Sequence, residues 1–134
     1  MKKKMLFIVV SLELGGTENY LLRFLDFTKN KKTKAVVLCK RGVTGSLEKK
    51  YLALGVRVIK MRVNNFPSIS WIRFYNFLKN EKIDTVCDFT GQCAGITLAI
   101  SKLVGIRKRI VFYRKSTNLF YEDKFRLIYN NWLN

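Results

Sequence analysis

The chain has 134 residues, of which 26 are Lys or Arg and 9 are Asp or Glu, so its net charge is +17. Hydrophobic residues make up 49% and aromatic residues 13%. This content excludes a disordered basic tail, which lacks the apolar area that offsets the entropy of ordering. The lack of histidine excludes Ser-His-Asp and Cys-His catalysis and any zinc site that needs imidazole.

The first part of the chain alternates apolar runs with segments of helical spacing. The run after the N-terminal lysines is continuously apolar, as expected of a strand buried on both faces of a parallel sheet. Tyr20, Leu21, Phe24 and Leu25 recur at helical spacing, and Gly55 is suited to end a helix in the left-handed conformation. The predicted elements are a strand at 4–10, a helix from 16 or 17 to 29, a strand at 34–40, a helix at 46–54 and a strand at 56–61.

The second part repeats this alternation after a turn at 64–67. Ser68 is a suitable N-cap for a helix that carries Trp71, Tyr75 and Leu78, and Gly105 is placed to close a later helix. The predicted elements are a helix from 69 to about 82, a strand at 85–89, a helix at 91–104, a strand at 109–113 and a helix at 122–133.

Strands that alternate with helices indicate βαβ units, whose right-handed crossovers require a doubly wound parallel sheet. We therefore predict an α/β, Rossmann-like sheet of about five strands in the order 3-2-1-4-5, with helices on both faces. Because no internal repeat, low-complexity tract or linker is found, residues 1–134 are expected to form a single domain.

Ligands of such a sheet bind outside the carboxyl ends of its strands. Gly15 and Gly16 stand there directly before a helix, where backbone N–H groups and the helix dipole suit a phosphate. A Gly-Gly pair equally suits a tight strand-to-helix turn, and neither G-x-G-x-x-G nor G-x-x-x-x-G-K-[ST] is present. We interpret Glu18, in the first helical turn, as a helix cap in preference to a catalytic group.

The cysteines predict a reducing compartment. Cys39, Cys87 and Cys93 are odd in number and form no C-x-x-C pair. Cys39 and Cys87 lie in strand-like runs, where a free thiol behaves as a small hydrophobe. No run approaches the ~20 apolar residues of a membrane span, so a cytoplasmic location is expected.

The first 27 residues carry a resemblance to a known family. The order basic residues, apolar strand and "L-x-x-G-G-[AT]-E" turn resembles the opening of the large retaining glycosyltransferase family with the two-domain B-type fold. The turn pattern falls on Leu12, Gly15, Gly16, Thr17 and Glu18. Segments 46–58, 83–86 and 102–114 agree in the same order, so the resemblance covers most of residues 4–116. It implies an incomplete first domain, because that domain has roughly one more strand and helix in the family. The family's second domain, with its glutamate pair, is also not in these 134 residues.

The resemblance also implies a function. It is the transfer of a sugar from a nucleotide-sugar donor to a glycan or lipid-linked acceptor in surface polysaccharide synthesis, with no metal or other cofactor. Gly15, Gly16 and Thr17 would form the donor-phosphate loop. The acceptor side of the cleft would be formed by the residues after the fourth and fifth strands, namely Asp88, Thr90, Gly91, Gln92, Arg114 and Lys115. Many members have a histidine after the fourth strand, and Asp88 is the catalytic candidate in that neighbourhood. Residues 1–134 alone are expected to be inactive.

The high positive charge leaves several other interpretations of this chain open. The basic runs at 29–34 and 107–109 are expected at the amino ends of strands, as a solvated face or as a contact to anionic lipid on the inner face of the cell membrane. The helix at 71–77 mixes aromatic and basic residues, which suits a membrane interface or a wide buried stripe. One alternative is a basic nucleic-acid-binding module, although no helix-turn-helix, RNP or zinc pattern is present. Another is a single-domain nucleotide-binding protein of flavodoxin-like topology.

Overall fold

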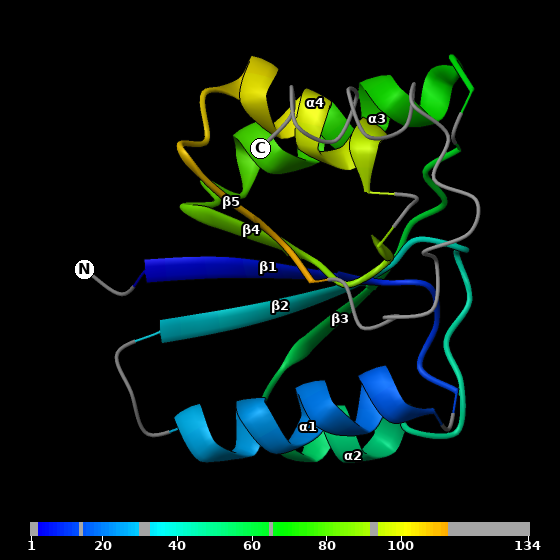
Figure 1. The fold of residues 1–134 in the computed structure, drawn as a ribbon, viewed down its shortest axis with the longest axis vertical. Coiled ribbons are helices and arrows are strands. Elements are labelled where there is room, and N and C mark those ends of the chain that lie inside the picture. Colours follow the sequence, from blue (N-terminus) through cyan, green and yellow to red (C-terminus); the bar gives the residue numbers. More distant parts are fainter. Residues whose placement is uncertain (1–2, 14, 30–32, 65, 92–93, 113–134) are drawn as a thin grey trace, which may run out of the picture.

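The computed structural model describes residues 3–13, 15–29, 33–64, 66–91 and 94–112 (Figure 1). Strands and helices alternate along this part of the chain. They are β1 (Lys3–Val9), α1 (Gly16–Thr28), β2 (Thr33–Cys39), α2 (Glu48–Ala53), β3 (Arg57–Lys60), α3 (Ile69–Asn80), β4 (Thr85–Asp88), α4 (Gly95–Val104) and β5 (Lys108–Val111). All neighbouring strands are parallel and their order is β3-β2-β1-β4-β5, which confirms the predicted topology.

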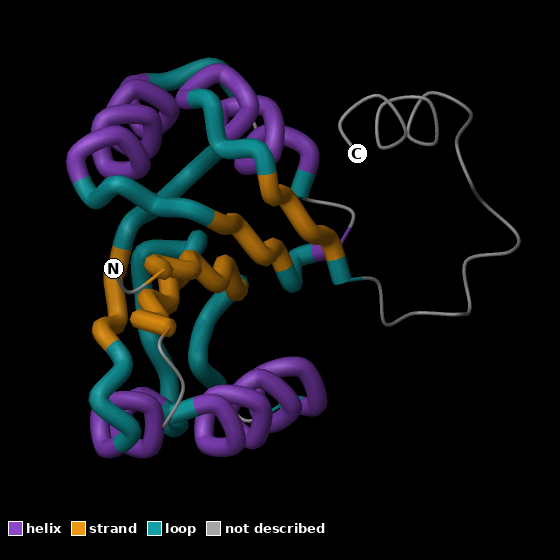
Figure 2. The backbone as a smooth tube through the Cα atoms, turned by 90° about the vertical axis from the view of Figure 1, so that its left-hand side faces the viewer, coloured by secondary structure: helices purple, strands orange, loops and turns teal. Residues whose placement is uncertain are grey.

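The sheet lies between two helical layers, with α1 and α2 on one side and α3 and α4 on the other (Figures 1 and 2). Because successive side chains of a strand point to opposite faces, β1 contributes to both cores. Leu6 and Ile8 join the cluster that contains Phe74 of α3, whereas Phe7 joins the cluster that contains Leu21 of α1. Both faces are therefore covered, which explains why the central strands are continuously apolar.

Several helix boundaries differ from the prediction by one to four residues, most of all the start of α4. The fourth helix begins at Gly95, so the predicted start at Gly91 is wrong. Gly91 has φ +62°, and its carbonyl accepts from the N–H of Ala94 at 3.1 Å, so a turn precedes the helix. α3 ends at Asn80, and the left-handed Lys82 (φ +52°) turns the chain toward β4. The predicted helix at 122–133 and the last residue of the predicted strand 109–113 lie outside the described residues.

The predicted capping residues Ser68, Gly55 and Gly105 are confirmed. The Ser68 hydroxyl accepts from the N–H of Ser70 at the start of α3. Gly55 and Gly105 adopt φ +76° and +99° after α2 and α4. Within α3, Phe74 and Leu78 are buried, which confirms a buried stripe on this helix.

The two described cysteines are buried, as predicted for small hydrophobes. Burial raises the pKa of the Cys39 and Cys87 thiols to about 11, which keeps both protonated at neutral pH. Cys93 lies outside the described residues. Among the described helices, none combines the length and apolar character needed to cross a membrane.

Candidate functional site

The loops at the carboxyl edge of the sheet are in direct backbone contact. The N–H of Leu47, after β2, donates to the carbonyl of Leu12, after β1, at 2.9 Å. A Cβ on Gly45 would lie only 2.4 Å from the backbone nitrogen of Glu13. Only glycine fits at this close approach, so the two loops are held as one unit.

The Gly15–Gly16 turn leads into α1 at this edge, as predicted. Gly15 is the N-cap and contributes no side-chain hydrogen bond to the helix end. The Oε2 atom of Glu18 lies 2.5 Å from where a Cβ of Gly15 would stand. The Glu18 carboxylate therefore covers the turn, where it is favourably placed against the helix dipole. A phosphate that binds at this helix end must compete with that carboxylate.

Asp88 is the buried carboxylate at the end of β4. Its Oδ1 accepts from the N–H and the hydroxyl of Thr90, at 2.7 and 2.5 Å, and its Oδ2 accepts from the hydroxyl of Thr97. Burial raises the pKa of Asp88, and these hydrogen bonds oppose the rise. Because Asp88 is 0% exposed, its carboxylate ties the loop after β4 to α4 and does not reach the surface in this arrangement.

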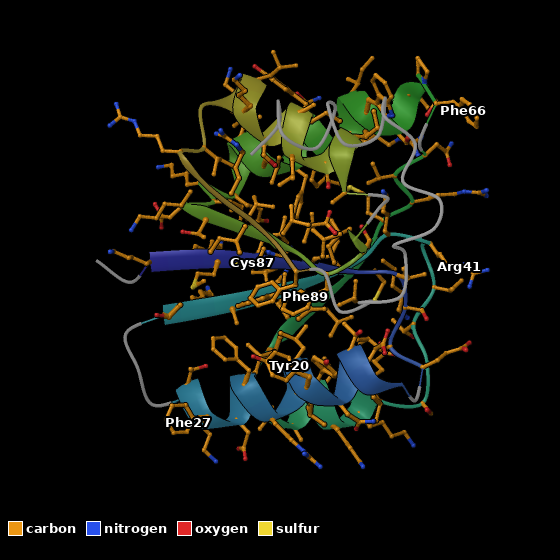
Figure 3. All side chains as sticks on the ribbon, in the orientation of Figure 1. Tyr20, Phe27, Arg41, Phe66, Cys87 and Phe89 are labelled. Atoms are coloured by element: carbon orange, nitrogen blue, oxygen red, sulfur yellow. The ribbon has the colours of Figure 1, made fainter. Side chains whose placement is uncertain are left out.

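A cavity of about 270 Å³ lies between the strand ends. We call it the basic cavity; it is lined by Val10, Lys40, Arg41, Arg62, Val63, Asn64 and Thr90. These residues follow β1, β2, β3 and β4 directly, so four neighbouring strands bring them together. Figure 3 shows Arg41 at the edge of the sheet where the strands end.

The basic cavity concentrates positive charge. Lys40 is only 7% exposed, and its ammonium is among the influences that lower the pKa of Asp88. Arg41 and Arg62 face each other across an isolated antiparallel bridge, and Arg62 Nε donates to Asn64 Oδ1 at 3.1 Å. Like charges directly opposite each other are destabilising. No carboxylate stands among the described residues that line the cavity.

The predicted site residues are distributed over this edge. Asp88 and Thr90 are hydrogen-bonded to each other, and Thr90 also lines the basic cavity. Gly15 is the N-cap of α1, Gly16 and Thr17 are its first residues, and none of the three lines that cavity. Gln92, Arg114 and Lys115 lie outside the described residues.

Sequence reasoning missed Lys40, Arg41, Arg62 and Asn64. A signal was present, because Lys40 ends one predicted strand, Arg41 directly follows it, and Arg62 directly follows the neighbouring predicted strand.

The predicted basic run at 107–109 lies at the amino edge, whereas residues 30–32 of the predicted run at 29–34 lie outside the described residues. A hollow of about 510 Å³ lies at this edge. Its polar lining residues are Lys3, Lys79, Lys82, Asp84, Thr85, Arg107 and Lys108. We call it the amino-edge hollow. Its five basic side chains are all exposed, in contrast to Lys40. Across the described part of the chain, no three His, Cys, Asp or Glu side chains form a group that could hold a metal ion.

Solved structures share this fold. MurG of Acinetobacter baumannii aligns with 81% of the chain at 14% identity and a TM-score of 0.60. A glycosyltransferase of Rickettsia africae ESF-5 aligns with 95% of it at 14% identity and a TM-score of 0.63. The chain spans 34% and 35% of these two proteins. No protein-family model matches the sequence, and no curated protein matches it significantly. The chain therefore shares its Rossmann-like fold with part of each of these two structures.

Proposed function

We propose that the chain is the acceptor-side domain of a glycosyltransferase that moves a sugar from a nucleotide-sugar donor to a glycan or lipid-linked acceptor in surface polysaccharide synthesis. The observation that carries the proposal is the carboxyl edge of the sheet. There the Gly15–Gly16 turn and the basic cavity lie on loops of the same edge. The glycosyltransferase fold of the solved relatives supports the same reaction class.

Sugar transfer requires stabilisation of a leaving nucleoside diphosphate, which backbone N–H groups and cations can supply. In this proposal Gly15, Gly16 and Thr17 border the donor phosphates. The acceptor lies along Thr90 and Gly91, and Gln92, Arg114 and Lys115 are further candidates for contacts with it. Asp88 acts as a positioning residue, because its oxygens hold Thr90 and Thr97.

We also propose a peripheral contact with the cytoplasmic membrane surface. Phe66, Ile69 and Ile72 are 79%, 65% and 61% exposed at the start of α3. Figure 3 shows Phe66 at the same end of the molecule as Arg41. Exposed apolar side chains close to basic ones suit an anionic lipid surface. Phe66→Ser/Ile69→Ser is expected to weaken sedimentation with anionic vesicles, and unchanged sedimentation would reject the contact.

A binding panel tests the proposed function. Calorimetric titration of residues 1–134 with nucleotide sugars, the free sugars and a single-stranded oligonucleotide is expected to show saturable binding of a nucleotide sugar. A nucleoside diphosphate should compete for that binding, and no sugar transfer above the blank is expected from this chain alone. Preference for the oligonucleotide, or a flavin retained in the purified protein, would contradict the proposal.

A further inference from the structure

We infer that the basic cavity binds a phosphate or diphosphate group of a substrate. The inference rests on the proposed function for the identity of that substrate. Anion binding itself rests on the described residues of the cavity alone.

No carboxylate is among the described residues that line the basic cavity with Arg41 and Arg62. The two arginines stand opposite each other in an isolated backbone bridge. Within the described chain, neither arginine forms an ion pair, whereas the nearby Lys60 lies 3.5 Å from a carboxylate oxygen of Glu48. An anion between the two arginines would relieve the repulsion across their bridge.

Backbone hydrogen bonds hold the two segments that carry Arg41 and Arg62. The N–H of Arg41 donates to the carbonyl of Val10 at 3.2 Å, and the N–H of Val63 donates to that of Lys40 at 3.0 Å. Because these segments are fixed, less ordering entropy opposes binding. The planar donor fork of arginine matches the geometry of phosphate oxygens.

The size of the basic cavity favours one substituent of a ligand over a whole nucleotide sugar. Its volume of about 270 Å³ lies just below the range of complete small-molecule sites, which begins at ~300 Å³. The polar groups of Thr90 and Asn64 line the same space. A phosphate group is the chemical class that satisfies the charge, the donor geometry and the size together.

The test is calorimetric titration of residues 1–134 with pyrophosphate at constant ionic strength. Arg41→Gln/Arg62→Gln is expected to weaken binding at least about tenfold, since each hydrogen bond to a charged group contributes strongly. The matched control is Arg73→Gln/Arg107→Gln, which removes the same charge from exposed positions elsewhere and should bind within about twofold of the wild type. Equal losses in both variants, or no loss in the first, would overturn the inference.

Amide chemical-shift mapping of the wild-type chain keeps the test valid if a variant fails to fold. Pyrophosphate should shift the resonances of Lys40, Arg41, Arg62 and Thr90. Shifts confined to the amino-edge hollow, or no saturable shifts, would overturn the inference.

Competition identifies the source of the phosphate. Geranyl diphosphate that displaces pyrophosphate better than a nucleoside diphosphate assigns the cavity to a lipid-linked acceptor. The opposite order assigns it to the donor, and either order supports the inference. If a single-stranded oligonucleotide displaces pyrophosphate at a much lower concentration than either diphosphate does, the cavity is a phosphate site but the proposed sugar transfer is contradicted. Failure of the inference and failure of the proposed function are therefore distinguishable.

Discussion

The two edges of the sheet are both basic, but they are organised differently. At the carboxyl edge, Lys40 is almost fully buried, and Arg41 and Arg62 face each other across a backbone bridge. At the amino edge the lysines and Arg107 are exposed, and Asp84 lines the hollow between them. Beside it, Lys4 and Arg57 both pair with Glu81.

This difference shows that net charge alone does not locate a site. A charge of +17 covers both edges, but the carboxyl-edge cavity has a buried lysine and no carboxylate among its described lining residues, whereas Asp84 lines the amino-edge hollow. The glycines at the two edges differ in how closely other backbone atoms approach them. A Cβ on Gly45 would meet the backbone of the neighbouring loop, whereas one on Gly55 or Gly105 would meet nothing within 4 Å.

The largest effect is expected from Gly45→Ala. The added Cβ would force the loops after β1 and β2 apart, and we expect the free energy of unfolding to fall by about 3 kcal/mol. The amino-edge control, Gly105→Ala, adds only the strain of a left-handed alanine, worth about 1 kcal/mol. Urea denaturation followed by circular dichroism measures both, and equal losses would contradict the contrast between the edges.

Thr97→Val should have the next largest effect. It removes the hydroxyl that donates to Asp88 and leaves a buried carboxylate oxygen unsatisfied. We expect the free energy of unfolding to fall by about 2 kcal/mol. Thr28→Val is the control at the other end, because the Thr28 hydroxyl donates to the Phe24 carbonyl at an exposed position. In the same denaturation experiment, the free energy of unfolding of the control should fall by under about 0.5 kcal/mol. A comparable loss in both would mean that the Asp88 cluster does not anchor the carboxyl edge.

The contributions of the two edges to stability should also change in opposite directions as the pH rises. Burial raises the pKa of Asp88, so its contribution to stability is greatest below its unfolded pKa of ~3.9 and is lost as pH rises through the folded value. Hydrogen bonds from Lys4 and Arg57 lower the pKa of Glu81, so its contribution is present above ~4.3 and is lost as pH falls through the folded value.

Relative to the wild type, Asp88→Asn should therefore gain stability from pH 4 to pH 7. Glu81→Gln should lose stability relative to the wild type as the pH rises from about 3 to about 5, by under about 1 kcal/mol, because the pKa of Glu81 is lowered from an unfolded value of ~4.3. Urea denaturation at each pH tests this. Differences from the wild type that move in the same direction for both variants would refute the assignment.

The smallest effect concerns the Gly15–Gly16 turn. Glu18→Gln removes the charge that covers the turn, and a helix N-terminus gains about 0.3–1 kcal/mol from an anion. In the Arg41→Gln/Arg62→Gln background we expect nucleoside diphosphate affinity to rise about two- to fivefold, measured by calorimetry. An unchanged affinity would indicate that the turn is structural only.

The fold could be predicted because its signals are local. Continuously apolar strands alternate with segments of helical spacing, and right-handed crossovers then constrain the topology. The glycine helix ends at Gly55 and Gly105 were predicted from the same local chemistry. The start of α4 was not, because the turn at Gly91 separates this helix from β4.

The site was only partly predictable because its contacts are long-range. The Gly15–Gly16 turn could be located from sequence, but the position of the Glu18 carboxylate over it could not. Arg41 and Arg62 meet because β2 and β3 are neighbours, which a linear pattern shows only after the strand order is known. The burial of Asp88 depends on the packing of α4 against β4.

The central claim is that the carboxyl edge receives the substrates of sugar transfer. The most direct measurement is an amide chemical-shift map of residues 1–134 titrated with the nucleotide sugar that binds best in the panel. We expect saturable shifts at Gly15–Thr17 and around Lys40, Arg62 and Thr90, with the resonances of Lys79, Lys82 and Arg107 unchanged. Shifts centred on the amino edge, or no saturable shifts with any nucleotide sugar, would contradict the account.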